Sequence, residues 1–326
     1  MKKNIALVTG GFSGEAVISY KTALTIDNNL DREKYNVYKI DINPKGWYYE
    51  SENGKIEIDK NDFSLYTGTR KIIFDAVFIG MHGTPGEDGK LQGYFDTLKI
   101  PYTGCDAATS AITFNKRYTV AVASMAGINV ANSVHLFKHS PLPEEQILKR
   151  LKLPVFIKPN NGGSSIGMSK VHKPEEFAHA LSKGFEEDDQ VLVEEMIKGR
   201  EFTVGVFKTK GNIIVLPITE VISKKDFFDY EAKYEGASTE ITPAEIEEEK
   251  AFKIKKSAEV LYRVFNCRGV VRIDFIFNEE TGNPFLLEIN SIPGQSEASI
   301  VPQQVKAMGW SLKEFYTQLV EECFRK

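Results

Sequence analysis

The clearest strand signals in the chain are VVRIDFI at residues 270–276 and FLLEIN at residues 285–290. Both runs are rich in β-branched and aromatic side chains. The segment between them contains Thr281 and Gly282, which are typical of a turn. We therefore predict an antiparallel hairpin over residues 270–290.

Polar side chains interrupt the apolar hairpin at Arg272, Asp274, Glu288 and Asn290. A spacing of two residues places Arg272 with Asp274 on one face, and Glu288 with Asn290 on one face. If the strands pair, carboxylate and amide oxygens converge, and such hard ligands suit Mg²⁺. The alternative is a solvated outer face, where alternating polar residues are ordinary. The long apolar runs around these residues count against that alternative.

Composition points to a soluble, globular and non-membrane protein of several lobes. The 326 residues are 42% hydrophobic and 26% charged, which is too apolar for disorder. A net charge of −4 argues against a nucleic-acid-binding surface. The three cysteines are scattered, and no apolar run is long enough for a membrane helix or a signal peptide. We expect a cytoplasmic protein.

The N-terminal region has the pattern of an open parallel α/β lobe. We expect a strand at 5–8, a glycine-rich turn at 10–14, a helix over 17–26 and strands at 35–42 and 74–79. The turn is not the dinucleotide GxGxxG, although its amides suit a carboxylate or phosphate. Glu15 lies at this turn, and for a lone Glu the plainer role is stabilising the first helical turn.

A shaped loop, MHGTPGEDGKLQG at 81–93, follows the third predicted strand. Open α/β sheets bind ligands at such strand ends, so His82 is a candidate ligand contact. The alternative is a loop held together by Glu87 and Asp88 bonding to its own backbone amides. The segment IPYTG at 100–104 then looks like a boundary between lobes.

The middle of the chain carries a second loop with the chemistry of a phosphate site. We expect a helix over 107–126, strands at 130–137, 155–157, 168–171 and 190–195, and a helix at 174–181. The loop KPNNGGSSIG at 158–167 lacks a Walker signature, but its amides can surround phosphates. Glu194 and Glu195 end a strand, and the apolar residues after them offer a wall for an adenine ring.

The last third begins with two expected strands, 201–207 and 213–218. Residues 223–243 show no sustained period and are typical of a lid or binding loop, with Lys233 and Tyr234 at the centre. We then expect a helix over 245–264, the hairpin, a loop over 291–300 and a last helix over 312–324.

Two groups of motifs, in this order and spacing, resemble the D-alanine–D-alanine ligase family, which has the ATP-grasp fold. The first is His82-Gly83-x-x-Gly86-Glu87-Asp88-Gly89 followed by IPYTG at 100–104. The second is Arg272-Ile273-Asp274, Glu288-Ile289-Asn290 and Pro293-Gly294. The resemblance covers nearly the whole chain. It implies an α/β fold with α+β lobes: an N-terminal lobe at 1–103, a middle lobe at 104–196 and a C-terminal lobe at 197–326.

The resemblance implies ATP-dependent synthesis of D-alanyl-D-alanine for peptidoglycan, through a D-alanyl phosphate. It also implies Mg²⁺ or Mn²⁺ as the metal and a homodimer as the assembly. Asp274, Glu288 and Asn290 match the metal ligands, and Arg272 and Gly294 match groups at the tetrahedral intermediate. The implied ATP contacts are Lys116, Lys158, Glu194, Glu195, Ile197, Glu201 and Lys233. The implied D-alanine contacts and associated lid residues are Glu15, His82, Ser164, Tyr234, Ser299 and Ile300.

This sequence departs from the family at several positions. Ala16 and Val17 replace the usual Arg and Glu after Glu15, Asn115 replaces an Asp, and Glu195 stands where Lys is frequent. Gln295 replaces a usual apolar residue, which questions the fine specificity for the second substrate.

Relatives that accept D-lactate carry His at the position of Tyr234, so the tyrosine favours an amine nucleophile. The alternatives are a carboxylate–amine ligase with another second substrate, and a nucleotide-binding regulator without catalysis.

Overall fold

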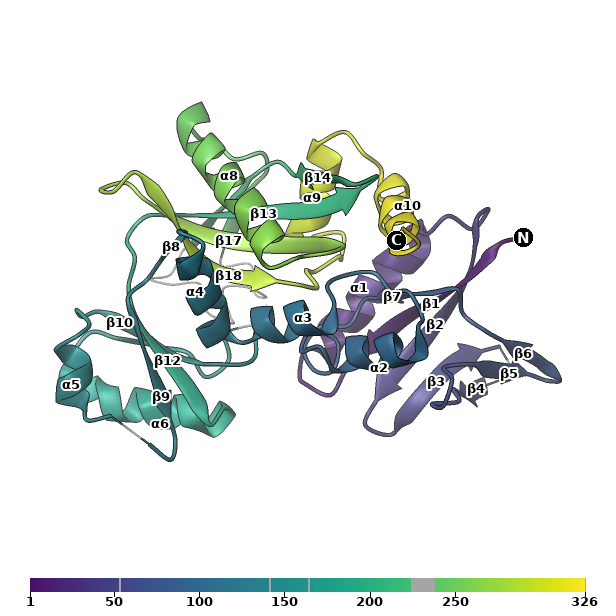
Figure 1. Ribbon diagram of the computed structural model, residues 1–326, viewed down its shortest axis with the longest axis horizontal. Coiled ribbons are helices and arrows are strands. Elements are labelled where there is room, and N and C mark those ends of the chain that lie inside the picture. The colour runs from purple at the N-terminus through teal and green to yellow at the C-terminus, as the bar shows by residue number, and fades with distance from the viewer. Residues whose placement is uncertain (53, 141, 164, 224–237, 326) are drawn as a thin grey trace.

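The computed structural model describes residues 1–52, 54–140, 142–163, 165–223 and 238–325 (Figure 1). Three main sheets follow one another along the chain: five strands near the N-terminus, four in the middle and seven in the C-terminal half. The lobe boundaries at 103/104 and 196/197 stay a prediction. Among the described residues, no helix combines the length and the apolar character needed to cross a membrane.

The N-terminal sheet has the order β4-β3-β2-β1-β7. Its parallel part is formed by β1 (Lys3–Gly10), β2 (Tyr35–Asn43) and β7 (Ala76–Ile79), with α1 (Ala16–Asn29) as the crossover. This confirms the predicted parallel arrangement. The antiparallel edge strands β3 (Gly46–Ser51) and β4 (Gly54–Glu57), and the small hairpin β5 (Leu65–Thr67) and β6 (Arg70–Ile72), were not predicted.

Alternation along β1 divides the N-terminal core between the two faces of the sheet. Ile5 and Leu7 pack toward α1 and toward α10 (Leu312–Cys323) from the C-terminal end of the chain. Ala6 and Val8 pack on the other face, in a cluster that includes Phe95 of α2 (Lys90–Leu98). The last helix therefore joins the first sheet to the C-terminal part of the protein.

The helix predicted over 107–126 is two helices, α3 (Ala107–Phe114) and α4 (Lys116–Met125). Asn115 separates them with an extended backbone, φ −97° and ψ 105°, and its side chain accepts a hydrogen bond from Tyr118 N. Asparagine favours such N-caps because its side-chain oxygen satisfies a free amide of the first turn. The predicted continuous helix was therefore wrong at this residue.

The strand predicted over 130–137 is also divided. β8 (Asn129–Val130) pairs with the C-terminal sheet, whereas β9 (Ser133–Phe137) belongs to the middle sheet. The chain crosses between the two sheets at residues 131–132.

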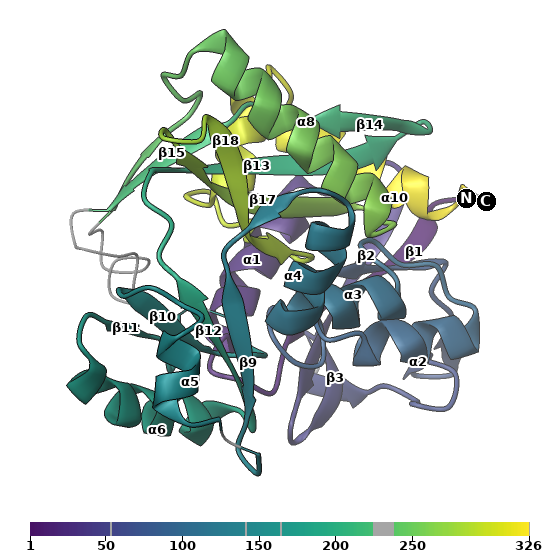
Figure 2. The same ribbon diagram turned by 60° about the vertical axis from the view of Figure 1, so that its left-hand side comes forward.

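The middle sheet has the order β11-β10-β12-β9. Its other strands are β10 (Val155–Pro159), β11 (Ser169–Val171) and β12 (Gln190–Glu195). One face is covered by α5 (Glu144–Leu148) and by α6 (Phe177–Glu187), which the short helix η1 (Pro174–Glu176) precedes (Figure 2).

The C-terminal sheet has the order β16-β15-β13-β17-β18-β8. The predicted hairpin is confirmed: β17 (Val270–Asn278) and β18 (Asn283–Asn290) are antiparallel, with a bulge between Asp274 and Phe275. Next to β17 lies β13 (Arg200–Thr209), which also pairs with β14 (Asn212–Val215). The region predicted to be irregular begins and ends in paired strands, β15 (Thr219–Ser223) and β16 (Ser238–Ile241).

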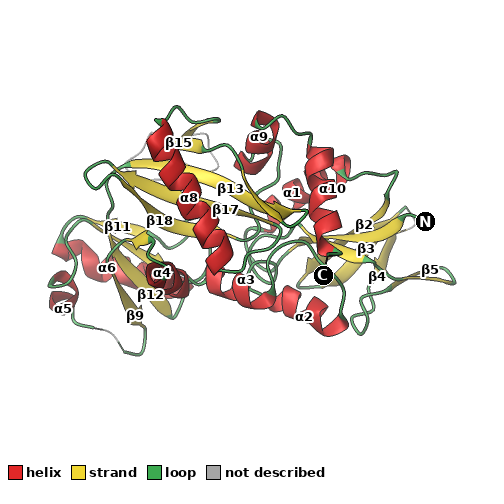
Figure 3. Cartoon of the chain, turned by 45° about the horizontal axis from the view of Figure 1, so that its top comes forward, coloured by secondary structure: helices red, strands yellow, loops and turns green. Residues whose placement is uncertain are grey.

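Two sets of helices cover this sheet. The long helix α8 (Glu248–Val264) lies across one face, with Ile254, Ala258 and Leu261 packed into the core (Figure 3). On the other face lie α9 (Ile300–Ala307) and α10, whose Val305 and Phe315 join the core shared with β1. The hairpin is thereby held from both sides.

Candidate active site

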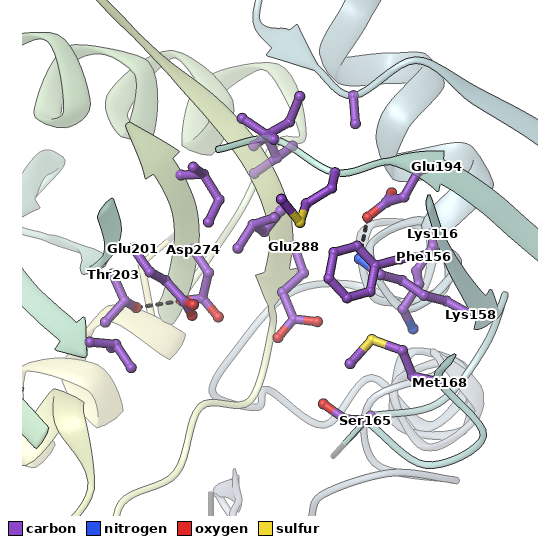
Figure 4. Close-up of a pocket in the computed structure, with 18 of the residues that line it drawn as sticks. Lys116, Phe156, Lys158, Ser165, Met168, Glu194, Glu201, Thr203, Asp274 and Glu288 are labelled. Atoms are coloured by element: carbon purple, nitrogen blue, oxygen red, sulfur yellow. Dashed lines mark hydrogen bonds and ion pairs between the residues drawn. The ribbon is translucent and has the colours of Figure 1, made fainter. Parts of the chain in front are cut away.

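A cleft with a volume of about 590 Å³ lies between the middle sheet and the C-terminal sheet. The chain passes along it from β12 to β13 through residues 196–199, which line it. Figure 4 shows Asp274 and Glu288 on one side of the cleft, and Phe156 and Lys158 on the other. The predicted site residues that line the cleft are Lys116, Lys158, Glu194, Glu195, Ile197, Glu201, Arg272, Asp274, Glu288 and Ile300.

The hairpin register brings the polar side chains of β17 and β18 together. Arg272 is paired with Asn290, and Asp274 with Glu288. Asp274 is buried, with 6% of the residue exposed, and its carboxylate accepts hydrogen bonds from Arg272, Asn290 and Thr203. The face that carries these groups is therefore part of the cleft, and not an open solvated surface.

The oxygen donors at the hairpin fit a magnesium ion. Asn290 Nδ2 lies 3.1 Å from Asp274 Oδ2 and 3.4 Å from Glu288 Oε1, so one small cluster holds both carboxylates and the amide. The hairpin supplies two carboxylates and one amide, and no group of three His, Cys, Asp or Glu side chains gathers as a metal site in the described ranges. Magnesium is commonly held by one or two carboxylates, with waters and substrate phosphates completing its shell.

Two lysines face the carboxylates from the other side of the cleft. Lys158 on β10 forms an ion pair with Glu194 on β12, because antiparallel pairing places the two strands side by side. Lys116 begins α4, and its Nζ lies 2.8 Å from Gly162 O in the glycine-rich loop. The break at Asn115 therefore places Lys116 at the first position of a new helix.

The apolar part of the cleft contains residues that sequence reasoning missed. Phe156, Met168, Ile276 and Leu286 line it beside Met196, which belongs to the apolar wall expected after Glu194 and Glu195. Each of these residues lies on a strand or next to one. Because side chains alternate between the two faces of a strand, the sequence pattern could have indicated which of them point toward the cleft. Glu195 is bound at the rim, where Lys152 N donates to Oε1 at 2.7 Å and Asn132 Nδ2 donates to Oε2 at 3.0 Å.

An ion pair between Arg200 and Glu220 in the cleft wall was also missed. Arg200 donates through Nε at 2.7 Å and through Nη2 at 2.8 Å to the two oxygens of Glu220. The residues lie on adjacent strands, β13 and β15, at a point that only the tertiary pairing reveals. Glu201, the predicted ATP contact, directly follows Arg200.

Glu15 lies between the two glycine-rich loops. A Cβ built on Gly83 would lie 2.7 Å from Glu15 Oε2, and one built on Gly163 would lie 2.9 Å from Oε1. Glu15 occupies the N-cap position of α1, but its side chain makes no capping hydrogen bond. Its carboxylate therefore lies beside both loops, close to the backbone of Gly83 and of Gly163.

The loop at 81–93 is held by its own acidic residues, as the alternative interpretation expected. Gly83 N donates to Glu87 Oε2 at 2.8 Å, and Thr84 Oγ1 donates to Asp88 Oδ2 at 2.6 Å. Burial, together with the nearby charge of Glu15, raises the pKa of Glu87 to about 8. This carboxyl group is therefore largely protonated at neutral pH.

His82, the second residue of this loop, has a buried side chain. Its Nε2 lies 2.8 Å from Thr22 Oγ1, and its backbone N–H donates to Ser19 Oγ at 2.9 Å. Burial lowers the pKa of His82 to about 4, so the imidazole is neutral. A Cβ built on Gly294 would lie 2.8 Å from Ser299 Oγ, which places these two predicted residues together. Ser164, Lys233 and Tyr234 lie outside the described residues.

Comparison with known sequences places this chain in a family. Residues 4–105 match the family described as "D-ala D-ala ligase N-terminus", and residues 122–321 match "D-ala D-ala ligase C-terminus". The chain belongs to the D-alanine–D-alanine ligase family. D-alanine–D-alanine ligases from Bacteroides fragilis and Phocaeicola vulgatus are 41% and 44% identical to it over 326 residues, covering 99% of this chain and 100% of each relative.

Solved structures of the D-alanine–D-alanine ligase family share the fold. The VanG D-Ala:D-Ser ligase from Enterococcus faecalis superposes with a TM-score of 0.88 at 31% identity, covering 99% of this chain and 100% of that chain. The D-alanine–D-alanine ligase from Bacillus anthracis complexed with ATP gives a TM-score of 0.80 at 26% identity, covering 99% and 98%. The predicted ATP-grasp fold is confirmed.

Proposed function

We propose that this protein joins two D-alanines to D-alanyl-D-alanine, with hydrolysis of ATP to ADP and phosphate, for peptidoglycan precursor synthesis. The observation that carries the proposal is the paired carboxylate cluster of Asp274 and Glu288 facing Lys116 and Lys158 across one cleft, in a chain of this family. Phosphoryl transfer to a carboxylate requires cations around the phosphates: the lysines supply them on one side, and a metal ion held by the carboxylates would supply them on the other.

The ATP would lie with its base against the apolar wall and its phosphates between the lysines and the hairpin. Lys116, Lys158 and the amides of the 158–167 loop would hold the phosphates, and Glu194, Glu195, Ile197, Glu201 and Lys233 would contact the nucleoside or its phosphates. Asp274, Glu288 and Asn290 would hold Mg²⁺, or Mn²⁺, which neutralises charge on the terminal phosphates when bound. Arg200, bonded to Glu220, would hold β13 in place and so position Glu201 at the ribose.

The reaction has two steps. The carboxylate of the first D-alanine attacks the terminal phosphorus of ATP, and ADP leaves. The amine of the second D-alanine then attacks the acyl carbon, loses a proton, and displaces phosphate from the tetrahedral intermediate. Arg272 and the backbone N–H of Gly294 would stabilise the oxyanion.

The substrates would be oriented by residues around the loop junction. Glu15, Ser164 of the 158–167 loop and Tyr234 of the expected lid would hold the ammonium of the first D-alanine. His82 lies behind this site. Ser299 and Ile300 would contact the carboxylate of the second D-alanine. The second substrate requires a separate test, because the D-Ala:D-Ser ligase from Enterococcus faecalis is as similar in fold as the D-alanine ligases.

We further propose a cytoplasmic homodimer. Cys105, Cys267 and Cys323 are free thiols, as expected in a reducing compartment that supplies ATP. Val17, Tyr20 and Leu24 form an exposed apolar stripe on α1, at a spacing that places them on one helical face. Light scattering should give the mass of a dimer, and V17E/L24E should give a monomer. A wild-type monomer at micromolar concentration would overturn the dimer.

The function is tested by measuring phosphate release from Mg-ATP with D-alanine, D-serine, D-lactate and L-alanine, and by identifying products by mass. Release with D-alanine alone, yielding the dipeptide, supports the proposal. Preferred formation of D-alanyl-D-serine would keep the mechanism and change the second substrate. No release from folded protein that binds ATP would overturn the catalytic assignment in favour of a regulator.

A further inference from the structure

A chain of hydrogen bonds in the protein interior joins four segments that are far apart in sequence. His82 Nε2 lies 2.8 Å from Thr22 Oγ1 on α1, and Gln295 N donates to the same Thr22 oxygen at 3.2 Å. On the far side, Tyr316 OH of α10 donates to Gln295 Oε1 at 3.3 Å. All four side chains are buried, with Thr22 and Tyr316 fully inaccessible.

The contact between His82 and Thr22 depends on which ring nitrogen carries the hydrogen. Burial keeps the imidazole of His82 neutral by lowering its pKa to about 4, so one ring nitrogen donates and the other accepts. With the hydrogen on Nδ1, Nε2 accepts from the Thr22 hydroxyl. The lone pairs of Thr22 then remain to accept the N–H of Gln295.

These hydrogen bonds connect the two halves of the proposed D-alanine site. Thr22 lies two turns along α1 from Glu15, and Ser19 between them accepts the His82 N–H at 2.9 Å. At the other end, Gln295 directly follows Gly294, which lies next to Ser299. The hydrogen bonds thus tie the helix that carries Glu15 to the loop that carries Gly294.

The same contacts explain the unusual Gln295. Its side chain is 4% exposed, it accepts from Tyr316, and its Nε2 donates to Pro293 O at 3.1 Å. Where the family usually has an apolar side chain, the amide of Gln295 forms two hydrogen bonds inside the protein.

We propose that the Thr22 hydroxyl donates to His82 Nε2, and that Thr22 and Gln295 are thereby positioning residues that set the separation between Glu15 and Gly294. The inference rests on the proposed function, since Glu15 and Gly294 are assigned there to the first D-alanine and to the oxyanion. It also assigns Gln295 no direct part in selecting the second substrate.

The first test compares Thr22→Val, which removes the hydroxyl, with Thr22→Ser, which retains it. Thr25→Val is the matched control, because Thr25 lies one turn further on α1 and its hydroxyl donates to Lys21 O within the same helix. Loss of this hydrogen bond should lower kcat/KM for D-alanine about tenfold in Thr22→Val. The KM for ATP should be unchanged, Thr22→Ser should recover most of the loss, and Thr25→Val should match the wild type. Equal losses in Thr22→Val and Thr25→Val, or no loss in either, would overturn the proposal.

A second measurement needs no catalysis and so separates this inference from the proposed function. Nitrogen-15 NMR of the imidazoles, with the His82 signal assigned by its loss in H82Q, should show the proton on Nδ1 and an unprotonated Nε2 at pH 7. Thr22→Val should shift the Nε2 resonance. A proton on Nε2 in the wild type would refute the arrangement, even in an active enzyme. Correct NMR signals in a protein that does not consume D-alanine would refute only the proposed function.

The role of Gln295 is tested with Gln295→Met, which restores the apolar type usual in the family. The ratio of D-alanine to D-serine as second substrate should stay within about twofold, while kcat/KM for D-alanine falls a few-fold, as expected for a lost indirect contact. A changed substrate ratio would show that Gln295 contacts the second substrate, and would overturn its assignment as a positioning residue.

Discussion

Arg272 and Asp274 lie on the same face of β17 and are joined by two hydrogen bonds, from Nε to Oδ1 at 2.9 Å and from Nη2 to Oδ2 at 2.7 Å. The pair places a cation at the edge of the proposed metal cluster, and its fork geometry fixes both side chains. We therefore propose two roles for Arg272: to orient the Asp274 carboxylate and to stabilise the oxyanion.

Arg272→Lys should retain the charge and lose the two-point contact. We expect kcat for dipeptide synthesis to fall about 100-fold or more, because one lysine cannot hold Asp274 and meet the oxyanion together. ATP binding, followed by calorimetry, should change much less. An Arg272→Lys enzyme with near wild-type kcat would show that the guanidinium geometry is dispensable.

Glu288→Gln should weaken metal binding while keeping the hairpin. Removal of one of two carboxylate ligands should raise the Mg²⁺ concentration needed for half-maximal phosphate release at least about tenfold. Glu280→Gln in the exposed turn of the same hairpin is the control. If both variants follow the wild-type Mg²⁺ titration, the metal assignment at Glu288 is wrong.

Glu87 should make the free energy of unfolding decrease as the pH rises. Its pKa is about 8 in the folded protein against 4.5 for a free side chain, so the folded state binds this proton more tightly. The resulting stabilisation is complete below pH 4.5 and is lost as the pH rises toward 8. Urea unfolding of Glu87→Gln and wild type at pH 5 and pH 9 should show the difference shifting in favour of the variant at pH 9. A constant difference would mean that Glu87 ionises normally.

Gln304 should be a stability residue outside the active site. This fully buried side chain of α9 accepts from Gly205 N and donates to Thr203 O and Thr219 Oγ1, where β13 changes its partner from β15 to β14. Gln304→Met should cost about 3 kcal/mol in the free energy of unfolding, because backbone groups are left without partners. The exposed Lys306→Met should stay within about 0.5 kcal/mol of wild type. A small effect at Gln304 would indicate that water replaces the amide.

Local patterns were sufficient for the hairpin, for the strands of the parallel lobe and for the final helix. Alternation of polar and apolar residues gave the face shared by Arg272 and Asp274 in advance, because side-chain direction in a strand depends only on sequence spacing. The same reasoning joined residues 107–126 into one helix, since the cap formed by Asn115 depends on a single side chain that periodicity does not weigh.

The sequence by itself therefore determined that Arg272 shares a strand face with Asp274, and Glu288 with Asn290, because side-chain direction alternates along a strand. Only the tertiary structure decided that Glu15 lies between Gly83 and Gly163, that Arg200 pairs with Glu220, and that Gln295 turns inward to Tyr316. Each of these relationships joins segments 20 or more residues apart. The packing of whole sheets and helices sets such distances, and no local pattern contains them.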